Sequence, residues 1–216
     1  RDSTRRKGSF DEQAEAVMEG SPCVLVGTQM LAKGHHFPEV TLVVVVNVDQ
    51  SLFSADYRAL ERLGQTLVQV SGRAGRVEKP GTVILQTCQP EHEALAQLIN
   101  EGYEPFAQAQ LEERVQAQLP PATYQALVRA DAHQRDDVER FLKAAKGCFP
   151  AGKASLFGPM PAIMEKVAGR YRMYLLVQAR ARSELHRQLD TWLDELRGLP
   201  AGRKVRWAID VDPQDL

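Results

Sequence analysis

The sequence predicts an α/β fold in two parts, a parallel sheet with helices followed by an α+β split βαβ domain. Three observations lead to this prediction. The run "TLVVVVNVD" over 41–49 is apolar without alternation, as in strands buried on both faces of a parallel sheet. The run "RYRMYLLVQAR" over 170–180 alternates, as in strands with one exposed face. Between them, "LPPAT" over 119–123 breaks a helical pattern and marks a boundary.

In the first part, residues 1–103, the signals run strand, loop, strand, helix, strand, helix, after one short helix. That order describes an open α/β sheet, which looks incomplete at its N-terminal edge. The strands are expected at 23–28, 41–49 and 81–87, and the helices at 11–20, from about 56 to 70, and at 90–103.

Residues 104–122 are expected to form a connecting helix and linker, and residues 123–216 a second domain. In this domain the signals follow the order strand, helix, strand, strand, helix, strand. That is the split βαβ, ferredoxin-like order. The strands are expected at 124–132, 155–167, 170–180 and 204–212, and the helices at 134–147 and 183–197.

Composition limits the classes of function. The chain has 216 residues, 44% of them hydrophobic, and a formal net charge of −1, so any nucleic-acid surface must be a local patch. No apolar run approaches the roughly 20 residues of a membrane span, and no secretory signal is seen, so we expect no membrane partner. The three cysteines are scattered, which argues against a zinc site or a disulfide framework in this chain and favours the reducing cytoplasm. The chain opens on Arg1 in a charged run, which indicates part of a longer protein.

The stretch "QVSGRAGR" over 69–76 places Arg73 and Arg76 three residues apart. On one helix face or helix start they would point the same way. Arginine forks fit phosphate oxygens, so the pair suggests phosphate binding. The alternative is a surface salt-bridge cluster with Glu61 and Glu78.

The loop "VGTQMLAKGHHFP" over 26–38 follows a predicted strand, where ligands of open α/β sheets bind. Its Thr28, Gln29 and Lys33 suit sugar-phosphate contacts. Adjacent His35 and His36 diverge, which disfavours a metal site. The loop is no P-loop, because its lysine and glycine stand in the wrong order, and no other stretch fits. "DELR" over 194–197 resembles an acidic magnesium box but lies in a helical pattern, so we expect no metal there.

The segment 27–76, from "GTQMLAKGHHFP" to "SGRAGR", resembles the second motor lobe of superfamily 2 helicases. Specifically, it is similar to the primosomal protein N′ (PriA) family of replication-restart helicases, whose motifs V and VI these two stretches match. The opening "RDSTRRKG", the junction "LPPATY" and the terminal "KVRWAIDVDP" also look like this family. The resemblance therefore covers essentially the whole chain.

The resemblance implies that residues 1–103 are part of a RecA-like lobe 2 whose motif VI faces ATP and Mg on a first lobe outside this sequence. Arg76 would be the arginine finger, Arg73 a second phosphate contact, and Gln69 a further residue facing ATP. The motif V residues would couple nucleotide state to the grip on DNA, namely Thr28, Gln29, Lys33 and Gly34.

The resemblance further implies an ATP-dependent 3′-to-5′ DNA helicase that recognises stalled forks and initiates primosome assembly. Its partners would be single-stranded and forked DNA, single-stranded-DNA-binding protein and other primosome proteins. Zinc would belong to a cysteine-rich module that this chain does not carry. Without a P-loop, the chain alone is expected to be inactive.

The last domain offers a candidate DNA or partner patch near Tyr171 and Tyr174. Interleaved arginines and aromatics can hold phosphates and stack bases; the alternative is an ordinary solvated strand face. Three methionines, Met160, Met164 and Met173, are expected in the core. The patch residues are Lys166, Arg170, Arg172, Arg180 and Arg182.

Two other functions compete. One is a non-catalytic adaptor that holds DNA or a protein through residues 120–216. The other is a metabolic α/β enzyme using "GHHFP", which is disfavoured because no nucleophile is paired with a base.

Overall fold

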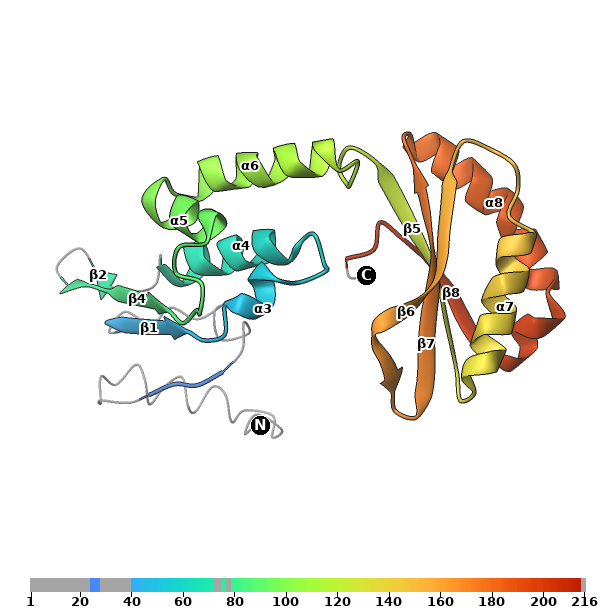
Figure 1. Cartoon of the computed structure of the whole chain (residues 1–216), viewed down its shortest axis with the longest axis horizontal. Helices are drawn as coiled ribbons and strands as arrows, with labels where there is room; N and C mark the ends of the chain where they lie inside the picture. Colours follow the sequence, from blue (N-terminus) through green and yellow to red (C-terminus); the bar gives the residue numbers. More distant parts are fainter. Residues whose placement is uncertain (1–23, 28–39, 72–74, 77–78, 215–216) are drawn as a thin grey trace. The chain divides into compact units, whose positions relative to one another are not determined.

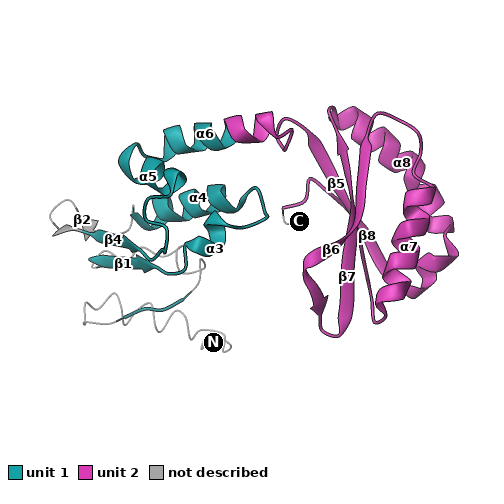
Figure 2. Cartoon of the chain, in the orientation of Figure 1, with its two compact units in different colours: residues 1–111 teal, residues 112–216 magenta. Residues whose placement is uncertain are grey.

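A computed structural model describes residues 24–27, 40–71, 75–76 and 79–214 of the chain (Figure 1). The chain divides into two compact units, Arg1–Leu111 and Glu112–Leu216 (Figure 2). The division falls within helix α6 (Tyr103–Gln116). No helix among the described residues is both long and apolar enough to cross a bilayer.

Unit 1 is built on a two-stranded parallel sheet. Strand β1 (Leu42–Val45) pairs with β4 (Thr82–Leu85), which confirms the predicted strands at 41–49 and 81–87. The remaining elements of this unit are helices and two short strands. They are α3 (Asp49–Leu52), α4 (Ala59–Ser71), β2 (Gly75–Arg76), β3 (Lys79–Pro80), α5 (Glu93–Asn100) and most of α6.

The core of unit 1 lies between the helices and one face of this sheet. Phe106 of α6 is 1% exposed and sits against Gly64 of α4, where an added Cβ would come within 2.6 Å of its ring. Glycine at 64 therefore allows α4 and α6 to approach each other closely. The buried hydrophobic residues are Val48, Leu52, Leu63, Leu67, Leu95, Leu98 and Phe106.

Two predictions for unit 1 are wrong. The described part of the strand expected at 23–28, residues 24–27, has no strand pairing, and Val24 and Val26 are 89% and 87% exposed. A β-branched run forms a strand only where a neighbour completes its hydrogen bonds.

Helix α4 ends at Ser71, and Arg76 lies in β2, paired with Lys79 of β3. The arginine motif therefore does not continue one helix; glycines at 72 and 75 disfavour a helical path.

Unit 2 is the predicted split βαβ domain. Its four strands form one antiparallel sheet in the order β6-β7-β5-β8. A 3₁₀ helix, η2 (Pro200–Lys204), was not predicted. The other elements are β5 (Tyr124–Ala132), α7 (Arg135–Gly147), β6 (Ser155–Val167), β7 (Arg170–Ala179), α8 (Arg182–Gly198) and β8 (Arg206–Val211).

Helices α7 and α8 cover one face of this sheet (Figure 1). Alternate residues of β5 and β7, such as Val128 and Leu175, point into the core and are fully buried. Trp192 of α8 is also fully buried, and its indole N–H donates to the carbonyl of Ala145 at 3.0 Å. Because side chains alternate along a strand, the residues between these core positions lie on the face away from the helices.

Strand β6 is the irregular strand of the sheet. Its register with β7 shifts between Phe157 and Met160, and again between Pro161 and Lys166. Prolines at 159 and 161 have no N–H to donate, so regular pairing is interrupted there. Three methionines were expected in the core. The prediction is confirmed for Met173, which is 6% exposed, and Met160 is half-buried. It is wrong for Met164, which is 65% exposed near the irregular stretch.

Candidate nucleic-acid interface

The structure describes only part of the predicted motor site. Gln69 is half-buried near the end of α4, and the backbone of Arg76 pairs in β2. The side chain of Arg76 and all of Arg73 lie outside the described residues, as does Glu78 of the alternative salt-bridge cluster. The predicted motif V residues Thr28, Gln29, Lys33 and Gly34 also lie outside them, together with His35 and His36.

The start of α4 is fixed by one buried carboxylate. Asp56 is 9% exposed and accepts a hydrogen bond from the backbone N–H of Arg58 at 3.0 Å. Its second oxygen pairs with the Arg62 guanidinium at 2.9 Å. An acid at this position satisfies otherwise free N–H groups and complements the helix dipole. The helix that carries Gln69 therefore has a defined beginning.

A second carboxylate joins the carboxyl ends of the two parallel strands. Asp49 follows β1, and it accepts hydrogen bonds from the Thr87 hydroxyl and, at 2.9 Å, from the Cys88 N–H after β4. The Thr87 hydrogen bond, followed by that from the Cys88 backbone, lowers the pKa of Asp49 below 3.8. The same carboxylate raises the pKa of the Cys88 thiol. This link was not predicted from the sequence, because it joins residues 38 and 39 positions apart.

In unit 2, the structure does not bring the five candidate basic residues into one patch. Arg170 and Arg172 lie at the N-terminal end of β7, next to the hairpin that carries Lys166. Arg180 and Arg182 follow the C-terminal end of β7. A ten-residue strand spans about 30 Å. The five residues therefore belong to two separate ends of the sheet.

Three of these five already have partners. Arg170 pairs with the Asp131 carboxylate and also donates to the Asp131 carbonyl at 2.9 Å. Arg182 pairs with Asp212 at 3.0 Å and lies over the Tyr124 ring. Lys166 lies 4.6 Å from the centre of the Tyr171 ring.

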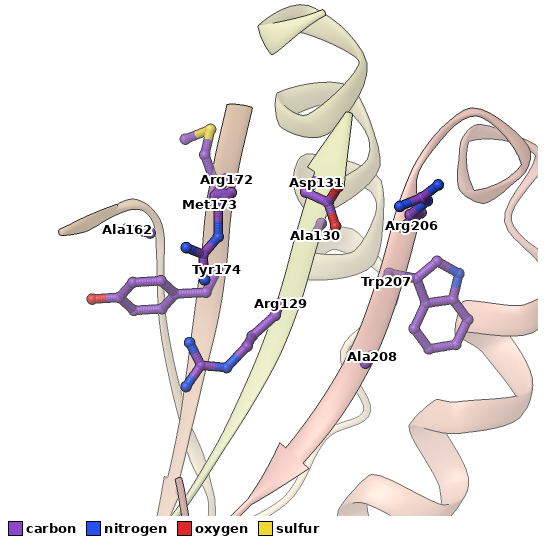
Figure 3. Close-up of a pocket in the computed structure, with 10 residues that line it drawn as sticks. All are labelled: Arg129, Ala130, Asp131, Ala162, Arg172, Met173, Tyr174, Arg206, Trp207 and Ala208. Atoms are coloured by element: carbon purple, nitrogen blue, oxygen red, sulfur yellow. The ribbon is translucent and has the colours of Figure 1, made fainter. Parts of the chain in front are cut away.

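Arg172 instead lines a hollow of about 260 Å³ on the sheet face away from the helices (Figure 3). Figure 3 shows Arg129 and Tyr174 extending to one side of the sheet while Trp207 points the opposite way. Trp207 packs against the core under the helices. We call this feature the arginine hollow and define it by Arg129, Arg172, Arg206 and Tyr174.

Strand register explains why these four side chains meet. Asp131 of β5 stands directly between Arg172 of β7 and Arg206 of β8. One row along, Arg129 stands directly beside Tyr174. Two neighbouring rows on three adjacent strands thus bring three arginines and one aromatic ring onto the same face.

Ion pairing differs among the three arginines. Arg129 pairs with Asp210 of β8 at 2.9 Å. The guanidinium groups of Arg172 and Arg206 make no ion pair or hydrogen bond to any residue that the structure describes. With Arg170 included, the four arginines and the two aspartates that pair with them, Asp131 and Asp210, carry a summed charge of +2.

Arg129 and Arg206 were not predicted from the sequence, which suggested basic residues near the β6–β7 turn and after the far end of β7 instead. The signal was present in the alternation of "LVRADA" and "VRWAID", where the core positions fix the opposite face. Pairing those strands with β7 in the correct register requires the structure.

Two protein families of known class match the chain. Residues 3–78 match the helicase conserved C-terminal domain, which is a RecA-like lobe, and residues 115–214 match the primosomal protein N C-terminal domain. Unit 1 thus carries part of a helicase lobe, and unit 2 contains a primosomal domain. The chain belongs to the replication restart protein PriA family.

Relatives from distant bacteria support this assignment. The chain is 47% identical to replication restart protein PriA of Haemophilus influenzae over 100% of its own length. It is 35% identical to the PriA protein of Bacillus subtilis over 98% of the chain, and 40% identical to that of Synechocystis sp. over 82%. The chain spans 30%, 27% and 22% of the length of these three relatives.

The described residues do not fit a metal site. They contain no group of three or more His, Cys, Asp or Glu side chains placed to hold a metal ion. Within this part of the chain, Cys88 is exposed and Cys148 partly buried, far apart in sequence and in different units.

Proposed function

We propose that the chain is the C-terminal part of an ATP-dependent DNA helicase that moves 3′ to 5′, recognises stalled forks and initiates primosome assembly. The observation that carries the proposal is 47% identity to a replication restart protein across the whole chain, including both helicase stretches. The two domain matches, a helicase lobe and a primosomal domain, support it independently.

In this proposal, motif VI acts on nucleotide held with Mg mainly by a first lobe outside this sequence. Arg76 is the arginine finger, Arg73 a second phosphate contact, and Gln69 a residue that faces the nucleotide. Support comes from α4, which the Asp56–Arg62 pair anchors at its start and which holds Gln69 within its last turn.

The motif V loop has a separate role, in which Lys33, with Thr28, Gln29 and Gly34, couples nucleotide state to the grip on DNA. The partners are single-stranded and forked DNA, single-stranded-DNA-binding protein and other primosome proteins in the bacterial cytoplasm. Zinc belongs to a module outside this chain.

Replacing Arg76 in the complete protein tests the proposal. Arg76→Ala should lower DNA-stimulated ATP turnover by about 10³- to 10⁵-fold, because an arginine finger stabilises charge that develops in the transition state. DNA affinity should stay close to that of the unaltered protein. Lys33→Ala should instead weaken DNA binding or uncouple turnover from DNA. Arg197→Ala, an exposed arginine of α8, is the control.

The opposite pattern would contradict these assignments. If Arg76→Ala abolished DNA binding and kept DNA-independent hydrolysis, the two stretches would have exchanged roles. If Arg76→Ala changed neither activity, the alternative of a non-catalytic adaptor would be favoured, because an adaptor does not depend on ATP turnover.

A further inference from the structure

The arginine hollow carries positive charge that its neighbours do not neutralise. Arg172 and Arg206 flank Asp131, but the Asp131 carboxylate is occupied by Arg170. The strands of Arg172 and Arg206 are separated by one strand, so their Cα atoms are about 10 Å apart. Two guanidinium groups that have no ion-pair or hydrogen-bond partner within the described ranges and face the same hollow are suited to bind an anion with several separated charges.

The hollow also offers an aromatic surface. The Tyr174 ring is half-buried on β7, in register with Arg129 on one side and Met160 on the other. Phe157 of β6 is 46% exposed and paired with Leu176, one row further along the same face. Exposed rings of this kind stack on nucleobases, and each stacked base contributes substantially to single-strand affinity.

The combination of arginines and an aromatic ring in the hollow favours one class of polyanion over others. An acidic peptide would use the arginines but has no flat base to place on Tyr174. In a duplex, the bases are stacked on one another and unavailable to a ring on a flat sheet. A single strand presents phosphates and unstacked bases together, and the four-stranded sheet of RRM domains stacks the bases of single strands on its aromatic side chains in this manner.

We propose that the arginine hollow binds a short segment of single-stranded DNA, with phosphates at Arg172 and Arg206 and a base stacked on Tyr174. The proposal names a DNA-contacting surface in unit 2, and it rests on the proposed function only in that the protein acts on DNA. It replaces the patch predicted from sequence, retaining Arg172 and adding Arg129 and Arg206.

The charge is tested with the 216-residue chain and a short fluorescein-labelled oligothymidylate, by anisotropy over a series of salt concentrations. The double variant Arg172→Ala/Arg206→Ala should bind about tenfold or more weakly. Its plot of log affinity against log salt should be shallower by about 1.4 units, about 0.7 for each lost phosphate contact.

The matched control is Arg140→Ala/Arg197→Ala, which removes the same charge from two arginines of α7 and α8 that are 63% and 66% exposed. This control should bind with nearly unaltered affinity and salt slope. Near-ultraviolet circular dichroism should show that both double variants remain folded.

Stacking is tested at Tyr174. Tyr174→Ala should weaken oligothymidylate binding by about 5- to 100-fold, whereas Tyr174→Phe, which keeps the ring, should stay within about twofold of the unaltered chain. The salt slope of both variants should be unchanged, because neither removes a charge.

Three results would overturn the proposal: no binding of oligothymidylate, equal losses in the two arginine double variants, or equal losses in Tyr174→Ala and Tyr174→Phe. If the chain bound a polyglutamate peptide in a manner that required Arg172 and Arg206, and did not bind DNA, the hollow would be a site for a protein partner instead. None of these measurements involves ATP, so their failure leaves the Arg76 test of the proposed function standing.

Discussion

Both units pack helices against one face of a sheet, but they leave different surfaces on the other face. In unit 1, Leu42, Val44 and Ile84 are 53%, 50% and 47% exposed on a parallel sheet. In unit 2, the equivalent face of an antiparallel sheet carries the arginine hollow. Parallel sheets are normally covered on both faces, whereas antiparallel sheets often present one face to solvent or ligand.

The difference separates two kinds of surface. The apolar face of unit 1 is suited to packing, and Gln69, the predicted nucleotide-facing residue whose side chain the structure describes, lies in the last turn of α4. The charged face of unit 2 is suited to a polar ligand and lies over a complete core of its own. The account therefore assigns nucleotide turnover to unit 1 and a direct DNA contact to unit 2.

The largest stability effect should come from the core of unit 2. Trp192→Ala should lower the free energy of unfolding of unit 2 by about 3–5 kcal/mol. The substitution removes a fully buried side chain together with the hydrogen bond to Ala145 and the edge contact with Phe149 that this side chain makes. The chain has two tryptophans, both in unit 2, so Trp207 fluorescence during urea unfolding reports this unit in the variant.

Leu98→Ala sharpens the comparison, because Leu98 lies in the core of unit 1. This variant should leave the Trp fluorescence transition within about 0.5 kcal/mol of the unaltered chain, as expected for sites that belong to separate cores and share no partners. An equal shift in both variants would mean that the two cores unfold as one.

A smaller effect is expected from the link between the strands of unit 1. The pKa of Asp49 is lowered in the fold, chiefly by the Thr87 hydrogen bond and then by that from Cys88. A depressed pKa contributes stability that is present above the unfolded value and is lost as pH falls through the folded value. Asp49→Asn should therefore destabilise unit 1 at pH 7. At a pH well below 3.8, the destabilisation should be much smaller.

Far-ultraviolet circular dichroism during thermal unfolding measures this pH dependence. Asp194→Asn, which changes an acid that is 86% exposed on α8, is the control. A difference between Asp49→Asn and the unaltered chain that stayed constant from pH 7 to well below 3.8 would argue against the assigned role of the carboxylate.

Local signals predicted most of the fold. Strand β5 was predicted at its observed bounds, and its sequence "YQALVRADA" lies between a proline pair and a polar turn. The run at 23–28 has equally strong local preference, yet residues 24–27 make no ladder. Strand preference alone does not supply a neighbour.

The site was less predictable, because its residues meet only through register. Arg129, Arg172 and Arg206 are far apart in sequence and join on three strands. The sequence instead suggested that Arg180 and Arg182 share a patch with Arg170, but the length of β7 separates them from it. Helix α4 was predicted well, but the helical placement expected for Arg76, on one helix face or helix start with Arg73, was wrong because Arg76 lies in strand β2.

One titration tests the division between the two units directly: steady-state ATP turnover by the complete protein against single-stranded DNA concentration. The account predicts that Arg76→Ala lowers the maximal rate by at least about 10³-fold. It predicts that Arg172→Ala/Arg206→Ala keeps the maximal rate and raises the DNA concentration for half-maximal activation about tenfold. A loss of maximal rate in the double variant at saturating DNA, with no change in the half-maximal DNA concentration, would contradict the account.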